Sequence, residues 1–139
     1  MVQIYLAAPL FTLAEQRFNL SLAEYLKAQG LTVFCPQVAC QGQSGAAIYQ
    51  TCLAGLTRAD VVVAILDGAD ADSGTCWECG YAVAKGIPVV AVRTDFRGSG
   101  DTGGFNAMLY YSAAVVVEKT DDEVFPAIAR AIAQLLAPN

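Results

Sequence analysis

Apolar runs and amphipathic stretches alternate along the chain, and this alternation predicts strands and helices in turn. Short β-rich or continuously apolar runs predict five strands, at residues 2–8, 31–35, 60–68, 87–93 and 113–118. Apolar residues at helical spacing predict helices at residues 13–29, 45–58, 75–85, near 105–111 and 121–136. Residues 36–44 are expected to form a loop, and residues 94–105 a flexible glycine-rich segment.

This regular alternation with short links is typical of a parallel sheet with helices on both faces. The run at 60–68 is apolar throughout, as expected for a central strand buried on both sides. We therefore expect a single domain over residues 1–139, an α/β fold with a flavodoxin-like, doubly wound, five-stranded parallel sheet of order 2-1-3-4-5. In that order ligands bind at the carboxyl ends of the first, third and fourth strands, so loops 7–12, 67–75 and 93–106 should line one crevice.

Composition and charge narrow the classes of function. A net charge of −5 and a pI near 4.4 argue against nucleic-acid binding, which usually needs a basic face. The N-terminal stretch has no cationic region, and charged residues interrupt each apolar run, so we expect no signal peptide, no membrane span and a cytoplasmic location. The chain has no histidine, so acid–base chemistry falls to carboxylates, tyrosine, lysine or cysteine.

Acidic residues gather after the third predicted strand, at Asp67, Asp70, Asp72 and Glu78. Asp72, Ser73 or Thr75 can cap the following helix, but capping does not explain Asp67 and Glu78 together. Glu78 lies near a helix N-terminus, where the helix dipole favours the ionised form that a nucleophile needs. Asp67, deeper and beside other acids, can stay protonated and donate a proton. Two such carboxylates are suited to cleave a glycosidic bond with retention of the configuration at the anomeric carbon. Acidic loops are also common in α/β folds that have other functions.

Cys76 and Cys79 flank Glu78 in a C-x-x-C, the spacing of redox pairs and of half a zinc site. A redox pair normally follows the first strand, whereas this one follows the third, with acids upstream that disfavour a thiolate. A zinc site completed by Cys35 and Cys40 would have loose spacing and no histidine. We therefore interpret the cysteines as small packing residues and expect no metal.

The loop after the first strand, "AAPLFT", lacks the glycines and lysine of dinucleotide and triphosphate loops, so we expect no cofactor. Leu10 and Phe11 can pack on a flat, neutral ring such as a nucleobase, or serve as plain core contacts. Tyr5, on the first strand, points toward the crevice if the alternation of that strand is read correctly.

The segments "IYLAAPLFT", "ADVVVAILDG", "DSGTCWECGYAVAKGIPVV" and "FNAML" together resemble the nucleoside 2-deoxyribosyltransferases, in the same order and over nearly the whole chain. The resemblance implies that Glu78 attacks C1′ of a 2′-deoxynucleoside and forms a covalent deoxyribosyl-enzyme intermediate. It implies that the Tyr5 hydroxyl orients Glu78, and that Asp67 protonates the departing base and deprotonates the incoming one.

The same resemblance implies the substrate-binding residues. Asp72 and Asn106 match groups that hold the sugar hydroxyls, and Phe11 matches an aromatic residue of the base pocket. Gly74 and Met108, in the segments "DSGT" and "FNAML", are expected to bind substrate as well. In the family the asparagine comes from a neighbouring subunit, so a homo-oligomer with shared active sites is implied.

We therefore predict a pentosyltransferase that exchanges the base of 2′-deoxyribonucleosides by a retaining ping-pong mechanism, with nucleosides and free nucleobases as its small-molecule partners. The nearest alternative is a hydrolase of 2′-deoxynucleosides, or of their 5′-monophosphates, in which water resolves the same intermediate. Related monophosphate hydrolases hold phosphate with serines and an arginine in the first loop. That loop has no cation here, although Arg17 follows it, so a free nucleoside is favoured.

A third hypothesis for a chain of this fold is a phospho-receiver domain with Asp67 as the phosphoacceptor. It needs an acidic pair after the first strand, and this chain has "AAPL" there. The sequence leaves open the preference for purines or pyrimidines, the subunit number, and whether loop 98–104 closes over the substrate.

Overall fold

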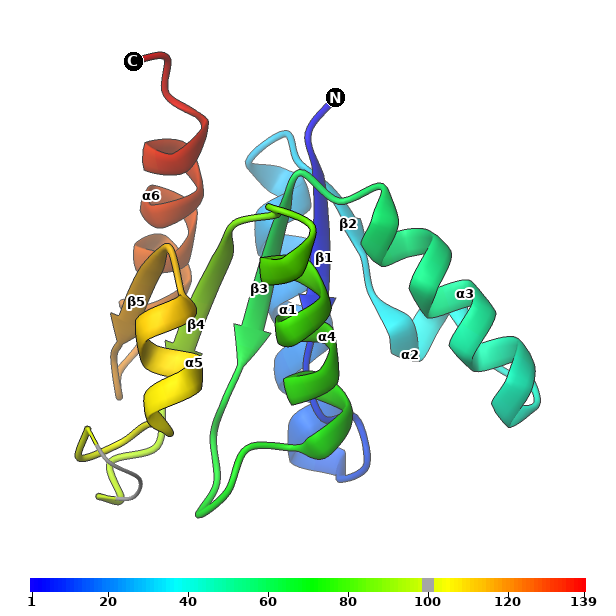
Figure 1. Cartoon of the computed structure of the whole chain (residues 1–139), viewed down its shortest axis with the longest axis horizontal. Helices are drawn as coiled ribbons and strands as arrows, with labels where there is room; N and C mark the ends of the chain where they lie inside the picture. Colours follow the sequence, from blue (N-terminus) through cyan, green and yellow to red (C-terminus); the bar gives the residue numbers. More distant parts are fainter. Residues whose placement is uncertain (99–101) are drawn as a thin grey trace.

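The computed structural model describes residues 1–98 and 102–139, and five parallel strands form one sheet in the predicted order β2-β1-β3-β4-β5 (Figure 1). The strands are β1 Gln3–Ala7, β2 Thr32–Phe34, β3 Val61–Ile65, β4 Val89–Arg93 and β5 Val115–Glu118. The helices are α1 Leu13–Ala28, α2 Pro36–Ala39, α3 Gly45–Thr57, α4 Ser73–Ala84, α5 Ala107–Ser112 and α6 Val124–Leu136. The glycine-rich segment includes residues 99–101, which lie outside the described residues, so the closure of loop 98–104 stays an open question.

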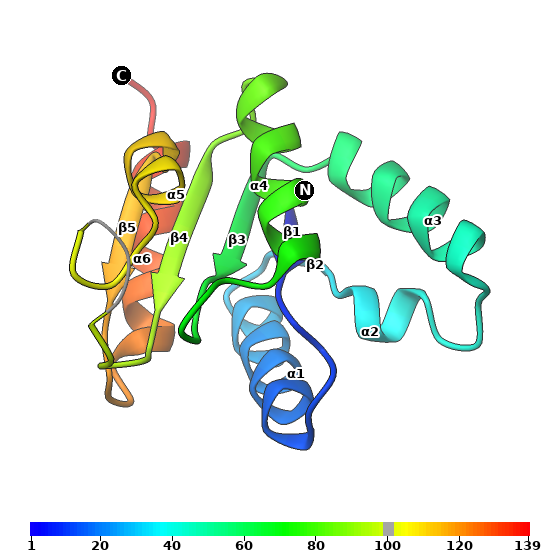
Figure 2. The ribbon, with the colours of Figure 1, turned by 60° about the horizontal axis from the view of Figure 1, so that its bottom comes forward.

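Side-chain alternation along the strands divides the core into two layers. On β1, Ile4 and Leu6 pack with α1 and α6 on one face, whereas Tyr5 and Ala7 pack with α3, α4 and α5 on the other. Figure 2 shows α1 and α6 on the opposite side of the sheet from α4 and α5. β3 and β4 are buried at every position, as continuously apolar central strands should be. Among the described residues, no helix has both the length and the apolar character needed to cross a bilayer.

A row of alanines crosses the sheet beneath α4. Ala7 pairs with Ala64, and Ala64 pairs with Ala91, so three small side chains lie side by side on neighbouring strands. All three are fully buried, and they share a core layer with Cys79 on α4. Small side chains let a helix approach a sheet closely, because closest packing is set by the size of the groups between them. The row therefore places α4 near the sheet, next to the side chain of Tyr5.

The link from β1 to α1 is fixed by polar contacts at the carboxyl edge of the sheet. Thr12 caps α1 in a capping box, since its hydroxyl accepts from the Glu15 amide and the Glu15 carboxylate accepts from the Thr12 amide. Asn19 is buried, and its amide donates to the Pro9 carbonyl at 2.9 Å and to the Gln37 side chain at 3.3 Å. These bonds join the loop to α1 and α1 to α2.

The sequence prediction was wrong over residues 36–44, which contain the short helix α2 rather than loop alone. Pro36 occupies the first turn of α2, where its missing amide hydrogen and fixed φ are tolerated. A four-residue helix carries too little periodicity to be recognised from its sequence. α2 and α3 lie beyond β2 at the edge of the sheet (Figure 2). Residues of both helices line the hollow described next.

Candidate active site

A hollow of about 870 Å³ lies between the β1–α1 loop, α1, α2, α3 and the start of α4. Its wall is mostly apolar and includes the aromatic side chains of Phe11, Tyr49 and Trp77. Among the described residues that line it, the charged side chains are Asp72 and Glu78, and none is a lysine or an arginine. A hollow of this volume with few, convergent polar groups is typical of a site for a small organic molecule.

Glu78 lies in the second turn of α4, and its carboxylate faces this hollow. Burial raises the pKa of Glu78 to about 7, the Tyr5 hydrogen bond opposes the rise, and the charge of Asp72 adds to it. The expectation that the helix dipole favours the ionised form is therefore outweighed, because the dipole acts mainly on the first turn while loss of hydration acts on the whole carboxyl group. A carboxyl group with this pKa exchanges its proton near neutral pH.

Tyr5 is fully buried on β1, and its hydroxyl donates a hydrogen bond to Oε2 of Glu78. Burial first, and then the neighbouring Glu78 and Cys52, raise the pKa of Tyr5 far above its usual range, so it stays a neutral donor. The side chain points to the α4 face of the sheet, as the alternation of β1 predicts. The structure thus brings together the two residues for which the sequence implied direct contact.

Asp72 and Gly74 lie at the start of α4 and line the same hollow. Oδ2 of Asp72 accepts from the amide and the hydroxyl of Thr75, both at 3.0 Å, so Asp72 caps the helix. These bonds leave Oδ1 for another partner. An added Cβ at Gly74 would lie 3.4 Å from Oδ2 of Asp72, in contact with the capping carboxylate.

Asp67 does not line the hollow with Glu78, in contrast to the single crevice expected from the sequence. It lines a neighbouring hollow of about 500 Å³ with Pro9 and Thr94. Its carboxylate accepts hydrogen bonds from the Thr94 amide and hydroxyl and from the Asp95 amide. Pro9 lines this second hollow whereas its neighbour Leu10 lines the first, so the β1–α1 loop divides the carboxyl edge of the sheet. The role of Asp67 in proton transfer stays a prediction.

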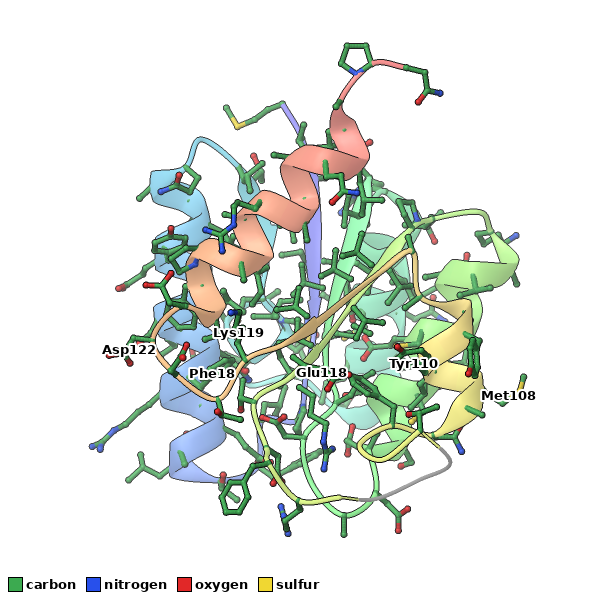
Figure 3. All side chains as sticks on the ribbon, turned by 90° about the vertical axis from the view of Figure 1, so that its left-hand side faces the viewer. Phe18, Met108, Tyr110, Glu118, Lys119 and Asp122 are labelled. Atoms are coloured by element: carbon green, nitrogen blue, oxygen red, sulfur yellow. The ribbon has the colours of Figure 1, made fainter. Side chains whose placement is uncertain are left out.

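Asn106 and Met108 also lie outside the hollow of Glu78 within one chain. Asn106 caps α5 through a hydrogen bond from the Met108 amide and borders a small hollow of about 70 Å³ with Ala71. Met108 is 78% exposed, and Figure 3 shows its side chain projecting outward from α5. Tyr110, on the same helix, packs instead on the buried Phe105 at 5.6 Å between ring centroids.

The thiols of the C-x-x-C are not suited to redox chemistry. Burial raises the pKa of Cys79 to about 12 and also raises the pKa of Cys76, so both stay protonated at neutral pH. All five cysteines of the chain are free. The interpretation of Cys76 and Cys79 as packing residues agrees with this environment, because the thiolate is the reactive form.

Sequence reasoning missed the wall that α2 and α3 contribute. The rings of Tyr49 and Trp77 meet edge to face with centroids 6.0 Å apart, and Trp77 stacks on Tyr81 with centroids 5.6 Å apart. A row of contacting aromatic rings therefore runs from α3 along α4. Gln16 and Gln37 line the hollow while their amides bond to backbone carbonyls of Leu10 and Gln16. The apolar "AAIY" at the start of the predicted helix 45–58 was an available signal, since such residues need a partner surface.

Comparison with known families and structures gives one family match. The model of the family described as Nucleoside 2-deoxyribosyltransferase matches residues 4–124 of the chain. No curated protein sequence gives a significant match.

Solved structures share the whole fold. A conserved protein from Enterococcus faecalis V583 superposes with a TM-score of 0.80 at 27% identity, covering 98% of this chain and 99% of its own. A 2-deoxyribosyltransferase from Bacillus psychrosaccharolyticus gives a TM-score of 0.77 at 24% identity, with 96% of both chains covered. A 2-desoxiribosyltransferase from Leishmania mexicana gives 0.71 at 21% identity, with 94% of this chain and 98% of its own covered.

Replacing Glu78 by glutamine should stabilise the folded protein, and the gain should grow with pH. The folded-state pKa of about 7 exceeds the usual value of 4.5, so the wild type loses stability as the pH rises between these values, whereas glutamine does not. The gain should be near zero below pH 4.5 and reach at most about 3.5 kcal/mol above pH 7, at about 1.4 kcal/mol per pH unit. Urea denaturation across this range measures it.

Glu24→Gln, at an exposed glutamate on α1, is the matched control. A stability difference between wild type and Glu78→Gln that does not change with pH would contradict the assigned environment of Glu78.

Proposed function

The chain belongs to the nucleoside 2-deoxyribosyltransferase family, and from this premise we propose that it exchanges the base of 2′-deoxyribonucleosides by a retaining ping-pong mechanism. The observation that carries the proposal is the Glu78 carboxylate at the wall of an apolar hollow, held by the hydroxyl of Tyr5. A carboxylate with little hydration and a fixed orientation is suited to attack an electron-poor carbon. The enzyme acts in the cytoplasm and needs no cofactor.

In the first step, one Glu78 carboxylate oxygen attacks C1′ of the nucleoside. The bond from C1′ to the base nitrogen breaks, its electron pair stays with the base, and the base takes up a proton. In the second step, a nitrogen of another base attacks C1′, the bond from C1′ to Glu78 breaks, and the incoming base loses a proton. Each step inverts C1′, so the overall exchange retains the β configuration.

Asp67 is the proposed proton donor and acceptor for the two bases. The geometry supports this role less directly than that of Glu78, because Asp67 lines the neighbouring hollow and is held by Thr94 and Asp95. Transfer to a base in the larger hollow requires the Asp67 carboxyl to leave these partners.

The sugar and the base have separate binding surfaces in this proposal. Asp72 binds a sugar hydroxyl through the oxygen that its helix cap leaves open, and Gly74 leaves room for the ring. Phe11, 73% exposed in the β1–α1 loop, packs on the base together with Trp77. The two carboxylates of the hollow repel a 5′-phosphate, so the free nucleoside is the preferred substrate over its monophosphate.

Asn106 and Met108 are proposed to serve the active site of a neighbouring subunit. Neither lines the Glu78 hollow of its own chain, and both are exposed, Asn106 at the N-cap of α5 and Met108 on the helix. Tyr111 on α5 and Trp77 on α4 are also large apolar side chains with 78% and 50% exposure, respectively. Exposed apolar groups of this size on adjacent helices suit a contact between copies of the chain.

Incubating the protein with deoxyinosine and free cytosine should yield the crossed nucleoside, because a second base resolves the intermediate. Chromatography of the products measures it, and deoxyinosine 5′-monophosphate should be a poorer donor. Release of free deoxyribose, with no nucleoside that carries the added cytosine, would show that the protein is a hydrolase rather than a transferase. Full activity in Glu78→Ala would contradict both.

Mixing two inactive variants should restore activity if active sites are shared between subunits. Glu78→Ala loses the nucleophile and Asn106→Ala loses the sugar contact, so each alone should be nearly inactive. Subunits unfolded and refolded together should form some sites with both residues intact and regain a fraction of the wild-type rate. No recovery in co-refolded mixtures that form mixed oligomers would show that Asn106 acts in its own chain or not at all.

A further inference from the structure

The ring of Tyr5 is held from one side by the ring of Phe34. Tyr5 on β1 and Phe34 on β2 are partners in the parallel register, so both side chains leave the sheet on the same face. Their ring centroids lie 5.2 Å apart with only 11° between the ring planes. Such a parallel stack limits tilting of the Tyr5 ring, because any tilt brings ring atoms together.

The Phe34 ring also lies close to the backbone of α3 at Gly55. A Cβ added to Gly55 would lie 2.7, 2.8 and 2.9 Å from three atoms of this ring, closer than real Cβ contacts allow. Gly55 and Leu56 are the buried residues of α3, so the helix packs on the rest of the molecule at this point. Glycine weakens a helix interior relative to alanine, and its presence here is explained by the room that Phe34 needs.

The far end of Tyr5 reaches the reactive group. Its hydroxyl donates to Oε2 of Glu78, and the Cys52 thiol, three residues before Gly55 on α3, also interacts with this hydroxyl. Contacts therefore run without a break from the Gly55 backbone through two aromatic rings to the Glu78 carboxylate. A displacement of the Phe34 ring changes the position of the hydroxyl.

We propose that Phe34 and Gly55 are positioning residues of this site: the Phe34 ring, which lies close to Gly55 and stacks on Tyr5, keeps the Tyr5 hydroxyl aligned with the Glu78 carboxylate. Neither residue touches the substrate in this assignment. The importance of this alignment for catalysis rests on the proposed function, whereas the alignment itself can be measured without any reaction.

Loss of alignment has a defined effect on the protonation of Glu78. The hydrogen bond from Tyr5 lowers the pKa of Glu78 against the effects of burial and of Asp72, so weakening the bond must raise that pKa. The titratable groups that interact with Glu78 or its donor are Tyr5 on β1, Cys40 at the end of α2, Cys52 on α3, Asp72 at the N-cap of α4 and Cys79 on α4. The thiols whose pKa burial raises stay neutral through the titration of Glu78, and Asp72 is untouched by the substitutions below.

The test is a titration of the Glu78 carboxyl by carbon-13 NMR in protein labelled at glutamate, with the signal assigned by its absence in Glu78→Gln. Gly55→Ala must displace the Phe34 ring, which stacks on Tyr5, and Phe34→Leu removes the flat surface on which Tyr5 stacks. Both should raise the pKa of Glu78 relative to the wild type, as should Tyr5→Phe, which removes the hydroxyl and keeps the ring. Gly45→Ala on the same helix is the control, because an added Cβ there meets nothing within 4 Å.

The decisive comparison combines substitutions. In the Tyr5→Phe background, Gly55→Ala should raise the pKa of Glu78 no further, since there is no hydroxyl left to displace. An equal further rise in this background, or an unchanged pKa in folded Gly55→Ala and Phe34→Leu, would overturn the proposal. If Gly55→Ala does not fold, the same comparison is made between the Phe34→Leu variant and the Phe34→Leu/Tyr5→Phe double variant.

Kinetics then links the alignment to the reaction. In the base-exchange assay at pH 7, kcat of Gly55→Ala should fall on the order of 10- to 100-fold with little change in KM, because misplacement of a reacting group by about 1 Å can cost this much. The acid limb of its pH profile should move upward with the Glu78 titration. An inactive wild type whose Glu78 titration still responds as described would reject the proposed function and leave the alignment standing.

Discussion

The hydrogen bond from the Tyr5 hydroxyl to the Glu78 carboxylate is the interaction on which the rest of the site depends. The hollow removes water from Glu78, and this loss of hydration alone favours the protonated, unreactive carboxyl group. A buried, neutral tyrosine returns part of that stabilisation to the anion and fixes its direction. The balance leaves Glu78 with a pKa of about 7, so a large fraction of this carboxyl group is ionised at neutral pH although it is largely buried.

The fold supplies the two ends of this bond from elements far apart in the sequence. β1 lies inside the sheet and presents Tyr5 on one face, while the alanine row lets α4 bring Glu78 close to that face. α2 and α3, beyond the β2 edge, add an apolar wall that the sheet alone does not provide. α3 therefore has two roles in this arrangement. It lines the hollow, and at Gly55 it lies against the Phe34 ring, which stacks on Tyr5.

Most of the fold was predictable from the sequence, since the apolar runs of β3 and β4 and the amphipathic stretches of α1 and α6 each carry a strong local pattern. The contact between Tyr5 and Glu78 was implied by a family resemblance and then found in the structure. Other features depend on distances that no local pattern encodes. The β1–α1 loop separates Asp67 from the larger hollow, and the burial of Glu78 outweighs the helix dipole. The four residues of α2 were missed because a single turn has no periodicity to detect.

The most direct test of the central claim, that Glu78 is the nucleophile, is to trap the intermediate. The protein is mixed with a 2′-deoxyribonucleoside without any acceptor base, quenched in acid within milliseconds to seconds, and analysed by intact mass and peptide mapping. The account predicts a mass increase of one 2-deoxyribosyl group on the peptide that contains Glu78, together with release of free base in equal amount. Release of base with no adduct under these conditions, or an adduct on a different residue, would contradict it.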